Sequence, residues 1–359
     1  MLQCYKLRIV SCWIAVMVLA TACSFSPDEK KSTPPKKVTS KGEPGRLVLV
    51  SSDDVYTHLE DVIDDVFYEP QLWLVQTEAH FKLSRMNAKS FGRSFIEHQT
   101  LLFLVTRSNF DELSAYLPGI QEEKLEALFQ DPEAMPISVV NKWAKPQHVY
   151  YLFAEDLSGL KHKLQYNKEA LLHSLYKNEI ADYAERLFKN KPHKNLAFKE
   201  IKQELGMGVA LPEKFELMKQ EQGFFWYSER YVGEQVGAFI YKVPYEHEHQ
   251  FQKSALIALR DSILQAQVPG PQEGTYMTTS GSDLYPFMYE SMEISGNYAV
   301  KLRGWWTVKG EYMAGPFVLY AVLSPDKKDI FIYEGYLYAP NKSKSKHYRT
   351  LESLGFTIQ

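Results

Sequence analysis

Cysteine is nearly absent from this chain of 359 residues. Its three cysteines, Cys4, Cys12 and Cys23, all lie at or before position 23. Disulfide bonds, thiolate nucleophiles and cysteine-ligated metals are therefore excluded from residues 24–359. Stability there has to come from a packed core, which a chain with 45% hydrophobic and 14% aromatic residues can supply.

The chain also lacks a hydrophobic run long enough to span a membrane. The apolar run near its start covers the 12 residues 9–20, whereas a membrane-spanning helix needs about 20. Lys6 and Arg8 provide a positive start before this run, and the small residue Ala22 follows it. This layout is typical of a cleaved export signal, so residues 1–22 are predicted to be a signal peptide.

The small residue directly before Cys23 resembles the cleavage site of bacterial lipoproteins. The resemblance implies that Cys23 is acylated and becomes the mature N-terminus, which would anchor the protein to a membrane. Two alternatives stay open, an ordinary secretory signal cut near Ala22 and a retained short anchor.

Positive charge is in deficit. The whole chain has a formal net charge of −3, and beyond Arg46 there are 33 basic and 41 acidic residues, a net charge of −8. A nucleic-acid-binding protein would show the opposite sign, so no nucleic-acid partner is expected.

Three sequence motifs of catalysis and phosphate binding are missing as well. The chain contains no nucleophile elbow (Gly-x-Ser-x-Gly), no His-Glu-x-x-His zinc motif and no phosphate-binding glycine loop. No catalytic residue and no cofactor are therefore predicted. Carboxylate pairs that assemble only in the folded protein leave no such motif, so glycosidase-like chemistry stays open.

The segment after the signal peptide is rich in proline, lysine and serine. Pro27, Pro34, Pro35 and Pro44 lie in it, with almost no apolar residues between them. Such a segment cannot bury enough surface to offset the entropy of ordering it. Residues 23–46 are therefore predicted to be a lipidated disordered tether.

Residues 47–191 are predicted to form an N-terminal α+β subdomain. Short apolar or alternating runs predict strands, and apolar residues at helical spacing predict helices. The resulting order is β-α-β-β-α-β with a further long helix, which indicates a ferredoxin-like (split βαβ) arrangement. The strands are expected at residues 47–50, 81–86, 101–106 and 149–154, and the helices at 55–66, 121–129 and 168–189.

Residues 192–359 are predicted to form a C-terminal α+β subdomain, packed against the first, with an antiparallel sheet and helices. Lys191 and Pro192 break the preceding helix, which places the boundary there. The expected strands cover residues 224–228, 236–243, 298–308, 317–323 and 330–338, and the expected helices lie near 251–263 and 347–354.

Residues 298–308 alternate in polarity as a strand should. Lys301, Arg303 and Trp305 lie on its polar face, where they could bind a carboxylate, phosphate or sugar. Glu334 lies on an apolar strand face, where a carboxylate needs a partner. The interpretation favoured by the sequence is an ion pair between Arg303 and Glu334, and the alternative is a ligand site at Arg303, Lys301 and Trp305.

His247 and His249 are two residues apart and would share a face of an extended segment. With a neighbouring Glu they form a weak candidate for a metal site. A metal needs at least three converging protein ligands, and no third candidate lies nearby in the sequence. A solvated helix start is therefore the favoured interpretation.

Several short motifs in the last hundred residues are similar to those of a known family. They include Arg260, Asp261 and Ser262, then residues 269–271, 303–306, 313–317 and 334–340. Together, and in this order, they resemble a family of Bacteroidota lipoproteins described as domain of unknown function 4837, from about residue 45 to the C-terminus. The resemblance implies a Gram-negative envelope lipoprotein and brings no catalytic residues with it.

These features favour a membrane-anchored cell-envelope lipoprotein with a non-catalytic binding or structural role. The expected location is the outer membrane, facing the periplasm, and surface exposure stays open. The expected partners are the membrane, through the lipid on Cys23, and another envelope protein or a glycan. The alternative function is an envelope hydrolase acting on glycan or peptide.

Overall fold

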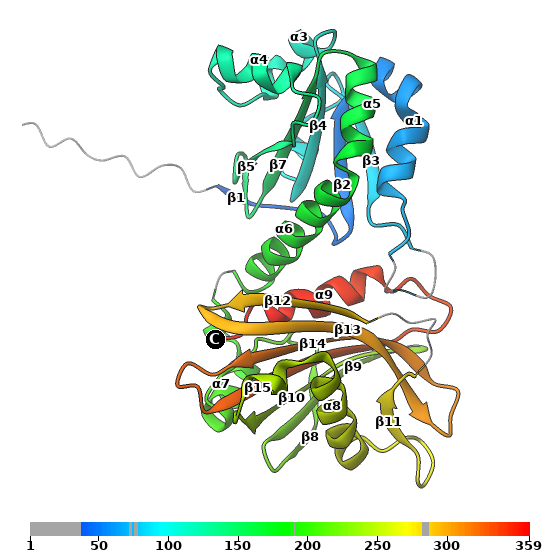
Figure 1. Ribbon diagram of the computed structural model, residues 1–359, viewed down its shortest axis with the longest axis vertical. Coiled ribbons are helices and arrows are strands. Elements are labelled where there is room, and N and C mark those ends of the chain that lie inside the picture. Colours follow the sequence, from blue (N-terminus) through cyan, green and yellow to red (C-terminus); the bar gives the residue numbers. More distant parts are fainter. Residues whose placement is uncertain (1–36, 72–73, 75–77, 190, 282–286) are drawn as a thin grey trace, which may run out of the picture. The chain divides into compact units, whose positions relative to one another are not determined.

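The computed structural model describes residues 37–359, apart from 72–73, 75–77, 190 and 282–286 (Figure 1). The predicted signal peptide, Cys23 and the first part of the predicted tether lie outside the described residues. In the described part of the chain, no helix combines the length and the apolar character needed to cross a membrane. Lys37–Gln359 is a single structural unit that contains two large sheets.

The first large sheet has five strands in the order β3-β2-β4-β7-β5. The pairs β2–β3, β2–β4 and β4–β7 are parallel, and only β5 runs antiparallel to its neighbour β7. A ferredoxin-like unit has an antiparallel sheet, so the prediction of that arrangement is wrong. The elements of this half are β1 (Val38–Thr39), β2 (Arg46–Ser51), α1 (Asp53–Phe67), β3 (Lys82–Asn87), α2 (Arg93–Ile96), β4 (Thr100–Thr106), α3 (Phe110–Leu113), α4 (Glu122–Gln130), β5 (Ile137–Val140), β6 (Ala144–Lys145), β7 (His148–Ala154), α5 (Leu157–Tyr166) and α6 (Lys168–Phe188).

The composition of the central strands explains the parallel sheet. All seven residues of β4 are buried, as expected for a parallel strand that is covered on both faces. Leu47 and Leu49 of β2 pack with α1 and α5, whereas Val48 and Val50 pack with α3 and α4 on the opposite face. Helix α1 supplies the crossover that a parallel β2–β3 pair requires.

Residues 37–46, which the sequence assigns to a disordered tether, are part of the fold. Strand β1 pairs with β6 in parallel, and the Lys41 N–H donates to the Glu97 carbonyl oxygen at 2.8 Å. The Gly45 N–H donates to Glu179 Oε1 at 2.7 Å. The prediction that the tether reaches residue 46 is therefore wrong, because backbone hydrogen bonds hold its last residues.

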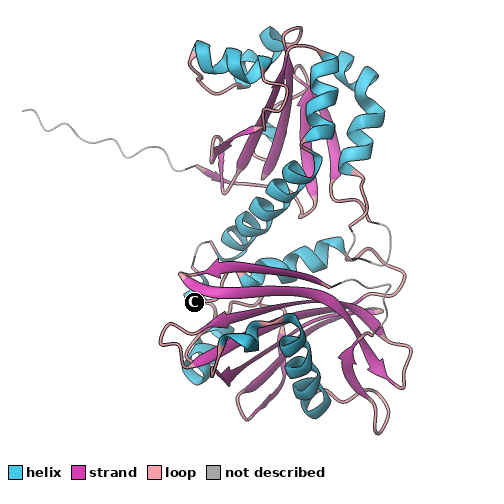
Figure 2. Cartoon of the chain, in the orientation of Figure 1, coloured by secondary structure: helices cyan, strands magenta, loops and turns pink. Residues whose placement is uncertain are grey.

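The second large sheet has eight strands, and all its neighbouring pairs are antiparallel (Figure 2). Its order is β11-β13-β14-β15-β10-β9-β8, and β12 also pairs with β13. The predicted antiparallel sheet with helices, and with it the α+β class, is confirmed. The elements are α7 (Leu196–Leu205), β8 (Glu216–Glu221), β9 (Phe224–Tyr231), β10 (Glu234–Pro244), α8 (Lys253–Gln267), β11 (Tyr276–Thr279), β12 (Met288–Ile294), β13 (Asn297–Lys309), β14 (Ala314–Leu323), β15 (Asp329–Tyr338) and α9 (Ser345–Gly355).

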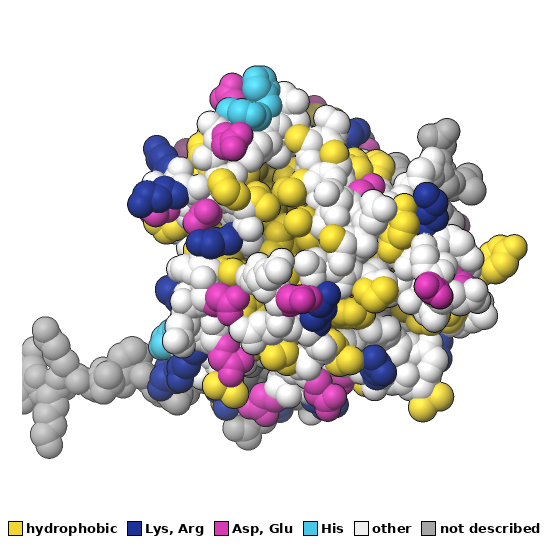
Figure 3. Space-filling view, turned by 90° about the horizontal axis from the view of Figure 1, so that it is seen from below, with side chains coloured by type: hydrophobic (Ala, Val, Ile, Leu, Met, Phe, Trp, Pro, Cys, Tyr) yellow, Lys and Arg dark blue, Asp and Glu magenta, His cyan; other side chains and the backbone are white. Residues whose placement is uncertain are grey.

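Each face of the second sheet packs against a helix. Leu256 and Leu264 of α8 join the core on one face, and Leu351 and Leu354 of α9 join the core on the other. The core under α8 is only partly covered, since Trp226 at its edge is half-buried. Hydrophobic side chains gather near the middle of the molecular face that Figure 3 shows from below.

Gly315 allows β14 and β15 to approach closely. A Cβ atom at this position would lie 1.9 Å from the Leu337 carbonyl oxygen and 3.0 Å from Trp306 Nε1. We expect Gly315→Ala to lower the free energy of unfolding by about 1–3 kcal/mol or more, because backbone has to move. Urea-induced unfolding measures the loss.

The neighbouring exposed residue Ala314 provides the control for this prediction. Ala314→Ser should change the free energy of unfolding by no more than about 0.5 kcal/mol. If Gly315→Ala is as mild as Ala314→Ser, the close approach of the strands does not depend on glycine.

Candidate functional site

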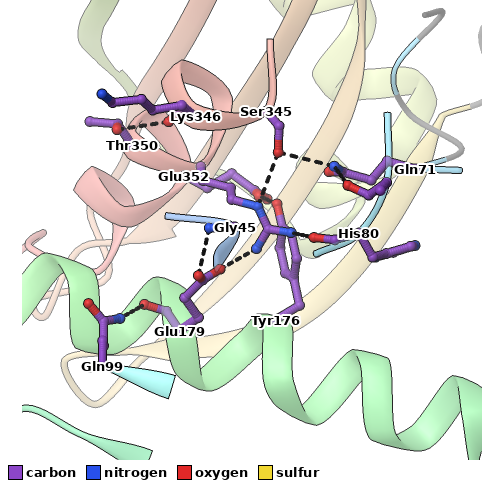
Figure 4. A network of polar contacts seen from close by, with 12 residues as sticks. Gly45, Gln71, His80, Gln99, Tyr176, Glu179, Ser345, Lys346, Thr350 and Glu352 are labelled. Atoms are coloured by element: carbon purple, nitrogen blue, oxygen red, sulfur yellow. Dashed lines mark hydrogen bonds and ion pairs between the residues drawn. The ribbon is translucent and has the colours of Figure 1, made fainter. Parts of the chain in front are cut away.

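Helices α6 and α9 meet through a buried ion pair. Arg349 Nη1 on α9 contacts Glu179 Oε2 on α6, and the two side chains are 0% and 2% exposed. Glu179 also receives the Gly45 N–H, and its backbone oxygen accepts a hydrogen bond from the Gln99 side chain at 2.9 Å. Figure 4 shows Glu179 and Tyr176 projecting from the same helix. Charged contacts therefore connect α6 to both the start of β2 and α9.

A cavity of about 250 Å³ lies beside this contact. Helix α6 forms one side of it, strands β12 and β13 with helix α9 form another, and the segments before β3 contribute His80 and Pro70. Its ionisable lining residues include Glu290, Lys301, Arg303 and Glu352. The apolar lining residues are Pro70, Leu172, Ile180, Met288, Met292 and Phe356.

Arg303 and Glu352 form the more deeply buried ion pair of the cavity. Arg303 Nε and Nη2 both lie 2.6 Å from Glu352 Oε1, and the Tyr176 hydroxyl donates to Glu352 Oε2. Burial alone would raise the pKa of Glu352, but the positive charges of Arg303 and Lys301 hold it below its usual value. Glu352 is therefore ionised, and both of its oxygens are engaged.

Lys301 and Glu290 form a second and looser ion pair. Lys301 Nζ lies 2.7 Å from Glu290 Oε2, and the two side chains are 11% and 37% exposed. Lys301 is two residues before Arg303 on β13, so both cations lie on the same face of the strand. Burial and the nearby Arg303 lower the pKa of Lys301, whereas Glu352 and Glu290 oppose this change.

Neither carboxylate of these pairs is suited to act as a general acid. Such an acid needs a pKa raised towards neutrality. The pKa of Glu290 is lowered, because Lys301 outweighs the effect of burial, and the pKa of Glu352 is lowered too. Burial also lowers the pKa of His80, to about 4, so its ring is neutral at physiological pH. The arrangement can bind charged groups, whereas Glu290, Glu352 and His80 are in their basic forms at neutral pH and do not act as general acids.

The predicted pairing of Arg303 with Glu334 is wrong, because the two side chains lie on opposite faces of the sheet. Arg303 is level with Val318 and Gly335 across β14 and β15, on the face that packs against α9. Glu334 is level with Leu319 and Leu302, on the face that packs against α8.

The partner of Glu334 is Arg260 on α8. Arg260 Nε and Nη2 bind the two carboxylate oxygens of Glu334 at 2.9 and 2.8 Å, and both side chains are 0% exposed. The inference that Glu334 needs a cation was thus correct, and the cation comes from a helix instead of a neighbouring strand.

The strand face expected to be polar is in fact buried. Lys301, Arg303 and Trp305 are all less than 10% exposed. Lys301 and Arg303 line the cavity, whereas Trp305 is not among the described residues that form its wall. Of the predicted candidates, the structure therefore brings two cations to the cavity and places Trp305 and Glu334 elsewhere.

His247 and His249 lie at the start of a short 3₁₀ helix (Glu248–Phe251), with ring centroids 5.8 Å apart. The backbone N–H groups of Glu246 and His247 donate to Gln250 Oε1, which is an N-terminal capping arrangement. The described residues contain no group of three or more His, Cys, Asp or Glu side chains placed to hold a metal. In the structure His247 is the N-cap residue of this short helix, and His249 lies within it.

Sequence reasoning missed Tyr176 and Glu352. A signal for Glu352 was present, since Tyr348, Leu351 and Gly355 surround it at helical spacing on the buried side of α9. A carboxylate in an apolar helical stripe needs a cation. Tyr176 gave no such signal, because a tyrosine in a buried stripe is ordinary core.

Comparisons with known proteins divide the chain in two. Residues 194–357 match a domain of unknown function (DUF4837). Residues 40–188 match a different domain of unknown function (DUF8532). The match to domain of unknown function 4837 that the motifs predicted is thus confirmed for the C-terminal half, and its predicted extension back to residue 45 is wrong. The Bacteroidota origin and the lipoprotein character that the resemblance implies stay predictions. No curated protein matches the chain.

Two solved structures show distant similarity. A crystal structure of a protein from Bacteroides thetaiotaomicron VPI-5482 matches at 10% identity and a TM-score of 0.24, over 43% of this chain and 44% of that one. LpqN, which is involved in cell envelope biogenesis of Mycobacterium tuberculosis, matches at 11% identity and a TM-score of 0.26, over 43% of this chain and 82% of its own. This chain thus spans less than half the length of the first. Scores this low carry no argument about function.

Proposed function

We propose that this protein is a non-catalytic cell-envelope lipoprotein that binds a small amphipathic molecule in the cavity between α6 and strands β12 and β13. The observation that carries the proposal is the cavity itself, which combines six apolar side chains with two ion pairs in its wall. A mostly apolar pocket with a few convergent polar groups is the usual form of a small-molecule site.

The charge states of Glu290 and Glu352 favour binding over a role for either carboxylate as a catalytic acid. Glu290 and Glu352 have lowered pKa values and cation partners, so neither can donate a proton as the acid of a glycosidase does. A binding site, in contrast, needs only fixed charges that orient the ligand.

Filling the cavity is expected to abolish binding. Leu172 on α6 is 4% exposed and lines the cavity, so Leu172→Trp would occupy the space of the ligand. Native mass spectrometry of the protein isolated from envelope in mild detergent should show an extra mass on the wild type that is missing from the variant.

Leu187 provides the control, since it lies on the same helix but is 36% exposed. Leu187→Trp should keep the bound molecule. If Leu172→Trp carries the same extra mass as the wild type while folding normally, the ligand does not occupy this cavity.

The proposed anchor predicts a specific modification of Cys23. Each buried CH₂ of an acyl chain contributes about 0.8 kcal/mol, so several chains would keep the protein in the membrane fraction through high-salt washing. Cys23→Ser should leave uncleaved precursor. Mass spectrometry of the mature N-terminus decides between the alternatives, because an unmodified Cys23 indicates an ordinary secretory signal and a retained Lys6 indicates an uncleaved anchor.

A further inference from the structure

We infer that the molecule bound in this cavity carries a carboxylate, which takes the place of Glu290 on the Lys301 ammonium while its aliphatic part fills the apolar side of the cavity. The inference rests on the proposed binding function and adds the chemical class of the ligand, an aliphatic monocarboxylate.

Lys301 has unused hydrogen-bonding capacity. An ammonium group has three N–H donors, and among the described residues Nζ contacts one carboxylate oxygen, Glu290 Oε2. The Lys301 side chain is 11% exposed and lines the cavity. A buried cation with donors to spare needs acceptors, and the cavity is the space from which a ligand can supply them.

The Glu290 side chain can move away from Lys301. Glu290 lies on β12, which pairs with β13 alone in the described sheet, and its side chain is 37% exposed. It can therefore turn towards solvent with little loss of burial. Glu352 is different, because it is 1% exposed and held by both Arg303 and the Tyr176 hydroxyl. Exchange of carboxylates is thus expected at Lys301 and not at Arg303.

Exchange of one carboxylate for another on Lys301 conserves the local charge. Removing the counter-ion from a buried ammonium is costly, whereas replacing one carboxylate with another keeps the local charge constant. Arg303, two residues along the same strand face, is already neutralised by Glu352, so the exchange concerns Lys301. A cationic head group offers no acceptor to the N–H groups of Lys301, and a neutral one would leave Glu290 in place.

The apolar side of the cavity suits an aliphatic remainder of the ligand. Met288 and Met292 on β12 line the cavity together with Leu172 and Ile180 on α6. Methionine side chains are flexible and adapt to aliphatic chains of different shape. The class that fits both the cation and this lining is an aliphatic chain that ends in one carboxylate.

Three probes of equal chain length test the inference, namely octanoate, 1-octanol and octylammonium, each titrated calorimetrically into the full mature protein at pH 7. Because its carboxylate forms a charge-assisted hydrogen bond with Lys301 while the displaced Glu290 becomes hydrated, octanoate should bind about tenfold more tightly than 1-octanol, which leaves the ion pair of Lys301 and Glu290 intact. Octylammonium should bind most weakly. In Lys301→Gln, octanoate should lose this preference over 1-octanol.

Glu290→Gln separates exchange from simple attraction. If the Glu290 carboxylate competes for Lys301, Glu290→Gln should tighten octanoate severalfold and leave 1-octanol unchanged. Glu169→Gln is the matched control, since Glu169 also lines the cavity but is exposed on α6, and it should change octanoate binding much less. Glu290 is partly exposed, so this variant should fold even if Lys301→Gln does not.

The outcomes separate the two proposals. Equal affinity for the three probes, or weaker octanoate binding by Glu290→Gln, overturns the carboxylate inference and leaves the binding function standing. If none of the probes binds, or if all bind equally to Leu172→Trp, the proposed function of the cavity fails.

Discussion

Arg260→Met is expected to lower the free energy of unfolding by about 3–5 kcal/mol, because it leaves the fully buried Glu334 carboxylate without its cation. Arg260 Nη1 also donates to Thr279 Oγ1 at 2.8 Å, and its guanidinium carbon lies 4.0 Å from the Phe317 ring centroid. Urea-induced unfolding measures the loss. The double variant Arg260→Met/Glu334→Leu should cost much less than Arg260→Met alone, because no charge is then left unpaired.

A surface ion pair of the same sheet is the matched control. Lys242 and Asp329 lie 2.9 Å apart on β10 and β15, and their side chains are 37% and 28% exposed. Lys242→Met should therefore cost no more than about 1 kcal/mol. If Arg260→Met is equally mild, the folded protein does not need the Arg260 cation to tolerate the buried Glu334 carboxylate.

The effect of Arg260→Met should also depend on pH. Burial raises the pKa of Glu334, and Arg260 opposes this rise. In Arg260→Met the opposing effect is absent, so the pKa of Glu334 is higher than in the wild type. A carboxyl group whose pKa is higher in the folded state contributes its stability below the unfolded pKa and loses it as the pH rises through the folded pKa. The deficit of Arg260→Met relative to the wild type should thus be larger at pH 8 than at pH 5.

The alternation within a strand was predictable, but the matching of faces between strands was not. Leu302 and Trp306 lie on one face of β13, and Arg303 lies on the other, as their period of two requires. A one-residue change of register moves a whole strand to the opposite face, and register cannot be obtained from either strand alone. For this reason Arg303 and Glu334 were each identified correctly as needing a partner but paired with each other.

Helical partners were missed because charged residues interrupt the apolar stripes. On α8 the buried stripe contains Arg260 between Leu256 and Leu264, and on α9 it contains Glu352 beside Leu351. Hydrophobic spacing treats such residues as solvent-facing. A charged residue inside an otherwise apolar stripe is better interpreted as one half of a buried pair, and here each helix supplies the partner of a strand residue.

The relative direction of neighbouring strands was the second feature that was not predicted correctly. The strands β2, β3, β4 and β7 were located in the sequence, but their order along the chain fits both an antiparallel and a parallel sheet. The buried runs of β4 and β7 favour a parallel sheet, and helix α5, which lies between β7 and α6, was not predicted. The edge strand β12 (Met288–Ile294) was missed as well, and with it one wall of the cavity, because Glu290 interrupts its apolar alternation and Ile294 is its only β-branched residue.

Arg349→Met is expected to lower the free energy of unfolding as much as Arg260→Met does, by about 3–5 kcal/mol, because it leaves the buried Glu179 carboxylate without its cation. The consequence for cooperativity should differ. Arg260 and Glu334 lie within one core, whereas Arg349 and Glu179 join α9 to α6, and Glu179 in turn holds Gly45 at the start of β2. Scanning calorimetry should therefore show two separate transitions for Arg349→Met where the wild type and Arg260→Met show one.

Lys346 on the same helix provides the control for this last prediction. Its Nζ lies 2.8 Å from Glu43 Oε1, and both side chains are more than 50% exposed, so Lys346→Met should cost no more than about 1 kcal/mol and keep a single transition. Glu179→Gln combined with Arg349→Met should recover part of the stability lost in Arg349→Met, because no buried charge is then left unpaired. A single transition in Arg349→Met, at the temperature of the wild type, would show that the contact between α6 and α9 does not depend on this ion pair.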